Sequence, residues 1–235
     1  KRGHSVTYVL NLYRMIEGGD YLIAILFLLL LIPMLFLLLF FNVATFSFAR
    51  LGMSQSGAFL FLTASIIGSL INIPLSRRRM TVQNPQGYPL SMFFFYYPPV
   101  VQEQVICLNV GGAGLPVLLS LYLLFGGRAP FWPSLLAVAL VAIIAKMMAR
   151  PKPGVGIVMP AFIPPLVAVA AALILAPSGH TAPVAYVAGA MGTLIGADLL
   201  NWREIQNLGA QMVSIGGAGI FDGIFLVGIL SAFLG

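Results

Sequence analysis

Apolar residues in this chain are grouped in long runs, and short polar segments separate the runs. A helix needs about 20 mostly apolar residues to cross the hydrocarbon core of a bilayer. Stretches of about that length cover residues 21–48, 58–75, 105–125, 131–148, 155–175, 184–200 and 214–234. The pattern predicts an all-α fold: a polytopic bundle of about seven transmembrane helices, forming a single membrane domain over residues 1–235.

Two segments outside these runs have patterns of their own. Residues 1–20 are short and polar, and we expect a cytoplasmic interfacial helix with apolar side chains on one face (Tyr8, Leu12 and Ile16). Residues 76–104 contain the turn-forming sequence Asn-Pro-Gln-Gly at 84–87, flanked by β-forming runs at 80–82 and 92–97. This loop is predicted to form a cytoplasmic β-hairpin at the membrane interface, with the aromatic run 92–97 as an anchor.

Composition and charge agree with a membrane protein and give it an orientation. The 235 residues are 60% hydrophobic and 8% charged, which a soluble surface would not tolerate. Ten of the twelve Lys and Arg residues fall on one side of the predicted spans, which places the N-terminus in the cytoplasm and the C-terminus outside. These cations are scattered at segment ends and form no patch with aromatic residues, so no nucleic-acid partner is expected. The single cysteine, Cys107, excludes an internal disulfide.

Two aspartates stand out because they lie inside the predicted spans. Of the six acidic residues, only Asp198 and Asp222 fall within apolar segments and not at segment ends or in loops. A carboxylate at membrane depth costs about 3 kcal/mol or more, so such a residue suggests a functional site. The helix pair of residues 184–235 carries both aspartates, one on each helix, with its connecting loop on the cytoplasmic side. Adjacent helices can therefore bring the two carboxylates together.

A pair of close carboxylates in low dielectric shares one proton, which provides one acid and one base. We therefore interpret Asp198 and Asp222 as a catalytic pair that activates water. Gly217 and Gly219 would let the backbone approach a substrate, although plain helix packing also explains these glycines. Asn109 and Asn201 are assigned to substrate binding. The structural alternative for each aspartate is a hydrogen bond to Asn201, Ser214 or a backbone group.

The residues also carry resemblances to two groups of proteins. From Gly68 to Pro74 and through 109–124, 150–165 and 192–234, the chain resembles an uncharacterised bacterial and archaeal membrane family, the domain of unknown function numbered 1614. This resemblance implies a multi-pass protein of a prokaryotic cell membrane and no particular activity. The last two helices resemble, at a distance, the intramembrane aspartyl proteases of the presenilin and signal-peptide-peptidase group. In that group a Gly-x-Gly directly precedes the second aspartate, whereas two residues separate Gly219 from Asp222 here.

Other catalytic classes find less support. The two histidines, His4 and His180, form no His-Glu-x-x-His zinc motif, and no phosphate-binding Gly-Lys-Ser/Thr sequence follows either Gly-Gly-Ala-Gly stretch. Either Ser54 or Ser56 is interpreted as the cap at a helix start. No cofactor and no metal are expected.

The predicted function is that of an intramembrane aspartyl protease-like hydrolase acting on a transmembrane peptide substrate within the lipid bilayer. The alternative is a proton- or cation-coupled transporter or channel in which Asn72, Asn109 and Asn201 line a path and the aspartates bind the ion. Seven helices are few for a carrier unless the chain forms a homo-oligomer, and this argues against the alternative. A non-catalytic scaffold is a third possibility. A weak internal repeat, Val110–Gly114 against residues 215–219, would suit the transporter.

Overall fold

The structure of this chain is a computed structural model, and it describes residues 2–82, 100–152, 156–207, 210–217 and 223–235. Side chains are described for these residues except at 2–24, 80–82, 100–102 and 223–225. The chain divides into two compact units, residues 1–43 and 44–235.

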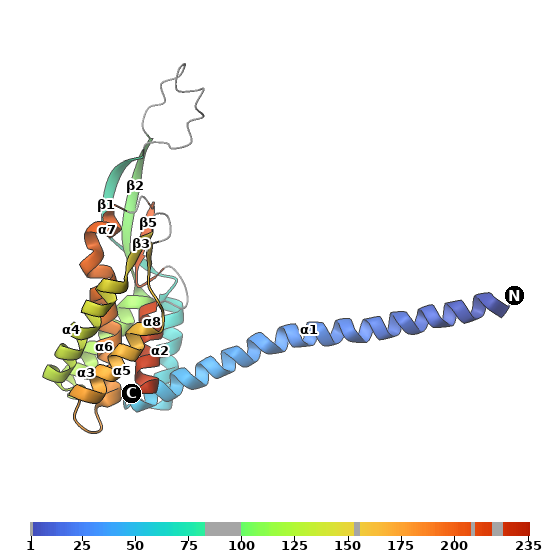
Figure 1. The fold of residues 1–235 in the computed structure, drawn as a ribbon, viewed down its shortest axis with the longest axis horizontal. Helices are drawn as coiled ribbons and strands as arrows, with labels where there is room; N and C mark the ends of the chain where they lie inside the picture. The colour runs from blue at the N-terminus through green and yellow to red at the C-terminus, as the bar shows by residue number, and fades with distance from the viewer. Residues whose placement is uncertain (1, 83–99, 153–155, 208–209, 218–222) are drawn as a thin grey trace, which may run out of the picture. The chain divides into compact units, whose positions relative to one another are not determined.

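A single long helix, α1 (Arg2–Arg50), makes up the first unit and continues into the second (Figure 1). Residues 1–20, expected to form a separate interfacial helix, are helical from Arg2 and run without a break into the apolar stretch. Pro33 lies inside the helix. The helix stops where Gly52 adopts a φ of 78°, a left-handed conformation that commonly ends helices. Placement of residues 1–20 at a membrane surface stays a prediction.

A three-stranded sheet in the second unit joins distant parts of the chain. Strands β1 (Asn72–Val82) and β2 (Val100–Asn109) are antiparallel, with Asn72 opposite Asn109. Strand β5 (Met212–Ile215) pairs with β2 in parallel, so the order is β1-β2-β5. Residues 80–82 of the predicted hairpin lie in β1 and pair with 100–102 of β2, whereas the expected turn at 84–87 and the predicted second strand at 92–97 lie outside the described residues.

The helices of the second unit gather around α6. This helix (Thr181–Thr193) contacts α3 (Leu115–Phe125), α4 (Phe131–Met148), α5 (Ile163–Leu175) and α8 (Gly223–Leu234). Eleven of its thirteen residues are buried, and most of these are Ala, Gly or Val. Small side chains let neighbouring helices approach closely, so α6 forms the core of the bundle.

The remaining elements are short. Helix α2 (Gln55–Gly68) begins at Ser54, whose hydroxyl accepts a hydrogen bond from the N–H of Gly57, which confirms the predicted serine cap. A small antiparallel pair, β3 (Arg150–Lys152) and β4 (Gly156–Val158), links α4 to α5. After α6 the chain forms a π turn (Leu194–Asp198), a 3₁₀ turn (Leu199–Asn201) and the short helix α7 (Trp202–Gln206). A second π turn, Val110–Gly114, connects β2 to α3.

Several predicted spans are therefore only partly helical. Residues 72–75, 105–109 and 214–215 were expected in the second, third and seventh helices, and they belong to the three-stranded sheet instead. Short apolar runs rich in Val and Ile suit a buried strand as well as a helix, so hydropathy alone cannot separate the two. Pro74 also disfavours continuing a helix, because it lacks the N–H that the helix would use. The chain is mostly helical, but a seven-span bundle is not confirmed.

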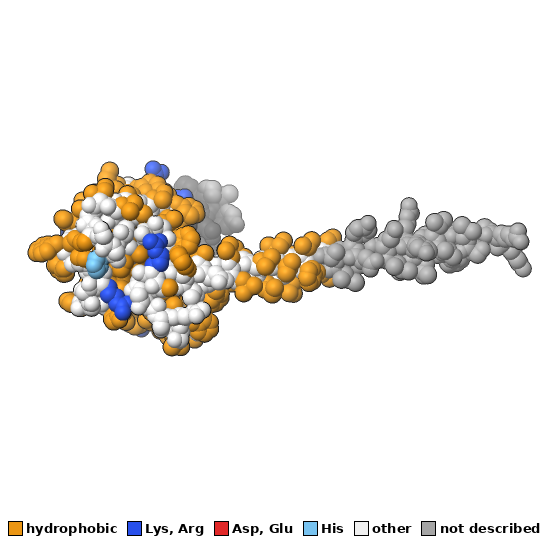
Figure 2. All heavy atoms as spheres, turned by 90° about the horizontal axis from the view of Figure 1, so that it is seen from below, with side chains coloured by type: hydrophobic (Ala, Val, Ile, Leu, Met, Phe, Trp, Pro, Cys, Tyr) orange, Lys and Arg blue, Asp and Glu red, His pale blue; other side chains and the backbone are white. Residues whose placement is uncertain are grey.

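Within the described residues, three helices are long and apolar enough to cross a membrane: Ile25–Arg50, Phe131–Met148 and Thr181–Gln206. The other apolar helices found there are shorter, at Gln55–Gly68, Val110–Phe125 and Ile163–Leu175. Hydrophobic side chains cover much of the face of the larger unit in Figure 2. These features are compatible with membrane association and leave the orientation of the termini as a prediction.

Candidate functional site around Asp198

Asp198 lies in the irregular helical segment that follows α6. It is the last residue of the π turn Leu194–Asp198, and the 3₁₀ turn follows directly. Its side chain is half-buried, and Oδ2 accepts a hydrogen bond from the backbone N–H of Gly216 at 3.4 Å. One of the structural alternatives considered for this aspartate, a bond to a backbone group, is thus observed. Because π turns occur often at functional sites, the position of Asp198 keeps it a candidate.

Gly216 and Gly217 turn the chain away from the end of β5. Both have a left-handed backbone, with φ of 83° and 81°, which favours glycine strongly. A Cβ at Gly216 would lie 2.5 Å from the Cβ of Ala113 in the other π turn, so only glycine fits there. The N–H of Gly217 donates to the carbonyl oxygen of Ser214. The predicted substrate-binding role of Gly217 is not tested by these contacts.

The second predicted catalytic residue, Asp222, and the predicted substrate-binding residue Gly219 lie outside the described residues. Helix α8 begins at Gly223, directly after Asp222. The pairing of the two carboxylates therefore stays a prediction.

Asn109 lies at the centre of a polar network that ties the sheet to the helices. Its side chain is fully buried. The Nδ2 of Asn109 donates to the carbonyl oxygen of Ser69 at 2.7 Å and to Oδ1 of Asn72 at 3.2 Å. Its Oδ1 accepts the N–H of Gly112 at 2.7 Å. The hydroxyl of Ser214 donates to the same Oδ1 of Asn72 at 2.6 Å. The network joins one residue from each of the three strands, and it holds β5 beside the other two.

Asn201, three residues after Asp198, is buried and belongs to a second polar cluster. Its Nδ2 donates to the carbonyl oxygens of Gly196 and Ala197. Its Oδ1 accepts a hydrogen bond from Nζ of Lys146, which comes from the last turn of α4. The same ammonium donates to the carbonyl oxygen of Leu200 at 2.8 Å and lies 3.4 Å from Oε1 of Glu204. Unpaired carbonyls at a break in a helix need such donors, so Lys146 stabilises the irregular segment.

The structure thus brings Asp198 to the first glycine of the segment that leads to Asp222. It gives Asn109 and Asn201 hydrogen bonds that organise the backbone on either side. Sequence reasoning did not identify Lys146 as a partner, because it interpreted this lysine only as a topology signal. A lysine in the last turn of an apolar helix is the only sequence signal for this role. It does not identify the partners of Lys146, which lie more than fifty positions later in the chain.

A family model described as a protein of unknown function, DUF1614, matches residues 66–234. The chain belongs to this family. The matched region contains both π turns, the three-stranded sheet and the polar clusters of Asn109 and Asn201. No curated protein and no solved structure matches the chain.

Proposed function

We propose that this protein is an intramembrane aspartyl hydrolase, in the manner of a protease, and that Asp198 and Asp222 form its proton-sharing pair. The observation that supports this proposal is the contact between the Asp198 carboxylate and the N–H of Gly216. Gly216 lies six positions before Asp222. The contact therefore draws the segment that leads to the second aspartate toward the first.

The chemistry needs one ionised and one protonated carboxyl group. The ionised aspartate takes a proton from water, the water oxygen attacks the peptide carbonyl carbon, and the protonated aspartic acid donates its proton to the carbonyl oxygen. Return of a proton to the amide nitrogen then releases the amine as the C–N bond breaks. The half-buried position of Asp198 suits this role, since water reaches it while the surrounding dielectric is low.

The sheet offers a way to hold an extended peptide. Among the described strands, β1 pairs only with β2, so its other edge has no strand beside it. An extended segment can add to such an edge through main-chain hydrogen bonds. The β1 residue Asn72 accepts a hydrogen bond from the hydroxyl of Ser214. Ser214 lies two positions before Gly216, so the start of β1 lies beside the segment that contacts Asp198.

The deciding experiment measures cleavage of a single-span substrate by the purified protein in liposomes. We expect the Asp198→Asn and Asp222→Asn variants each to lose activity by about a hundredfold to ten-thousandfold, the usual contribution of general acid–base groups. Glu204→Gln is the matched control, because it neutralises a carboxylate six positions after Asp198 that the proposal leaves out, and it should retain activity. Full cleavage by either aspartate variant would refute the catalytic pair.

Proton- or cation-coupled transport is the second candidate, and the irregular segment after α6 favours it. Transporters bind ions at interrupted helices, where backbone groups and carboxylates are exposed to the path. Asp198 lies at such an interruption. If the native protein cuts no substrate over a range of pH while the same liposomes show a proton or cation flux that Asp222→Asn abolishes, transport replaces hydrolysis.

A further inference from the structure

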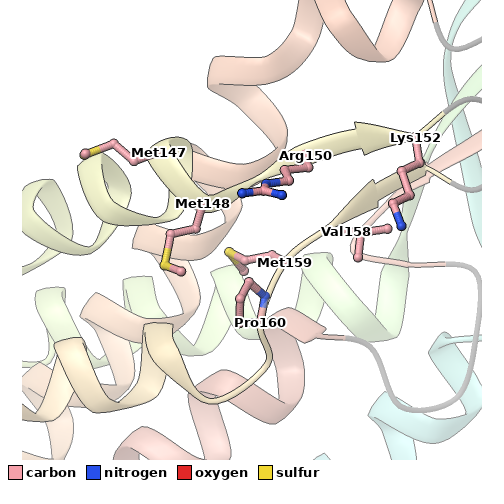
Figure 3. Close-up of a pocket in the computed structure, with 7 residues that line it drawn as sticks. All are labelled: Met147, Met148, Arg150, Lys152, Val158, Met159 and Pro160. Carbon is pink, nitrogen blue, oxygen red and sulfur yellow. The ribbon is translucent and has the colours of Figure 1, made fainter.

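A cavity of about 570 Å³ lies where α4 ends and the β3–β4 pair begins (Figure 3). Its wall is formed by methionines and other apolar side chains together with two cations, Arg150 and Lys152. In Figure 3 the guanidinium of Arg150 is on the side of the methionines, and Lys152 lies beside Val158. The cavity therefore combines positive charge with an apolar floor, and it is separate from the contacts of Asp198.

The two cations have no acidic partner. Among the described residues, neither the Arg150 nor the Lys152 side chain takes part in an ion pair or hydrogen bond, and both residues are exposed on β3. The sequence between Glu103 and Asp198 contains no acidic residue. Residues two apart on a strand point to the same face, with Cα atoms about 7 Å apart. Both side chains can thus reach one anionic group.

An exposed apolar stripe on α4 leads to this cavity. Leu136, Leu140, Ile143 and Met147 are exposed at 57%, 43%, 58% and 79%, and their spacing of four, three and four residues places them on one face. Met147 belongs to both the stripe and the cavity wall. The stripe is about 16 Å long at the helical rise per residue. This is close to half of the roughly 30 Å hydrocarbon core, the depth of one leaflet.

We propose that this cavity is a binding site for an anionic phospholipid. The phosphate of the lipid lies between Arg150 and Lys152, the methionines contact its glycerol region, and one acyl chain follows the stripe of α4. A basic pocket beside apolar helices is the arrangement that binds anionic head groups. The length of the stripe favours a lipid over a free anion, because an inorganic phosphate would leave the apolar face uncovered.

The test uses the full-length protein in phosphatidylcholine vesicles that contain a small amount of phosphatidylglycerol with a photoreactive head group. After irradiation, mass spectrometry maps the labelled peptides. We expect labelling at Met147, Met148 or Met159, and a decrease of about tenfold to thirtyfold in the variant that combines Arg150→Gln and Lys152→Gln, because each cation near a membrane surface attracts anionic lipid.

The matched control combines Arg77→Gln and Arg79→Gln on β1, which also removes two exposed cations spaced two residues apart. Its labelling at the cavity should equal that of the native protein. The proposal fails if a photoreactive phosphatidylcholine labels the cavity equally well, or if the Arg150 and Lys152 variant keeps its labelling. Competition by excess inorganic phosphate would show a free-anion site and would also overturn it.

Discussion

Helix α1 and helix α6 are both long enough with their continuations to cross a membrane, but they differ completely in burial. None of the apolar window in Ile25–Arg50 is buried, whereas 72% of the window in Thr181–Gln206 is buried. The first is rich in Leu and Phe, and the second is rich in Ala and Gly. Inside a bilayer, large apolar side chains gain nothing from contacting protein instead of lipid, while small residues allow close packing. The window in α1 also has the higher mean hydropathy, 2.8 against 1.4, so the exposed helix combines large side chains with high hydropathy, whereas the buried helix combines small side chains with lower hydropathy.

The largest expected loss of stability comes from adding a larger side chain in the π turn that follows α6. Gly196 follows α6 in the π turn, and a Cβ there would overlap the carbonyl oxygen of Ala142 and lie 2.8 Å from the Cβ of Ala145 on α4. Gly196→Val should lower the free energy of unfolding by about 3 kcal/mol, because overpacking forces the two helices apart. Unfolding by SDS in mixed micelles measures this quantity.

A matched control for this change is Leu30→Val in α1, where the side chain is 72% exposed. It should alter the free energy of unfolding by no more than about 0.5 kcal/mol. Equal effects of the two substitutions would remove the distinction between the helices.

A smaller loss is expected when a buried amide is removed from the core. Asn109→Ala leaves the N–H of Gly112 and the carbonyl oxygen of Ser69 without their partner, which should cost about 2 kcal/mol. Asn42→Ala in α1 is the counterpart, since the Asn42 side chain is exposed and donates only to the preceding turn, at Leu38. The same SDS titration should show almost no change for Asn42→Ala. A similar loss at both positions would contradict the assignment of Asn109 to a buried network.

The polar cluster of Lys146 and Asn201, after the π turn, should contribute still less to the free energy of unfolding. Lys146→Met removes the donor to Leu200 and Asn201 and should destabilise the protein by about 1 kcal/mol. Glu204→Gln should have an effect near zero, because its ion pair with Lys146 is largely exposed. Thermal unfolding in detergent would rank the two. A larger effect for Glu204→Gln would indicate that the ion pair and not the capping of carbonyls holds this segment.

The smallest effect is expected within α1 itself. Leu30→Ala and Leu37→Ala both truncate exposed side chains, and each should leave the thermal unfolding of the protein unchanged within about 0.5 kcal/mol. A loss above about 2 kcal/mol would instead have the size of a cavity in a packed core. It would mean that α1 is buried by a further partner, such as a second copy of the chain.

Hydropathy was sufficient to predict the helices that consist of one uninterrupted apolar run. The range 131–148 coincides with α4. Residue type predicted a cap at Ser54 or Ser56, and the cap is Ser54. Hydropathy could not distinguish helix from strand at residues 105–109 and 214–215, because Val, Ile and Leu are common in both structures. The parallel pairing of β2 with β5 depends on contacts across more than a hundred residues, and no local pattern encodes it.

For the site, the sequence predicted that Asp198 and Asp222 would pair, and this pairing stays a prediction because Asp222 lies outside the described residues. The prediction came from the cost of a carboxylate at membrane depth, a local property. The sequence did not predict that a strand would precede Gly216 or that Lys146 would support Asn201, since both depend on how separate segments pack.

The π turn at Leu194–Asp198 also changes the phase of everything that follows it. An α-helix advances about 100° per residue. A π turn advances less per residue and a 3₁₀ turn advances more, and here the 3₁₀ turn Leu199–Asn201 follows the π turn directly. The irregular segment follows the part of the chain that presents Gly189 and Gly192 to α8 and α4, and after it Asn201 accepts a hydrogen bond from Lys146. A deletion of a single residue in this turn would thus misalign the surface before the turn with the surface after it.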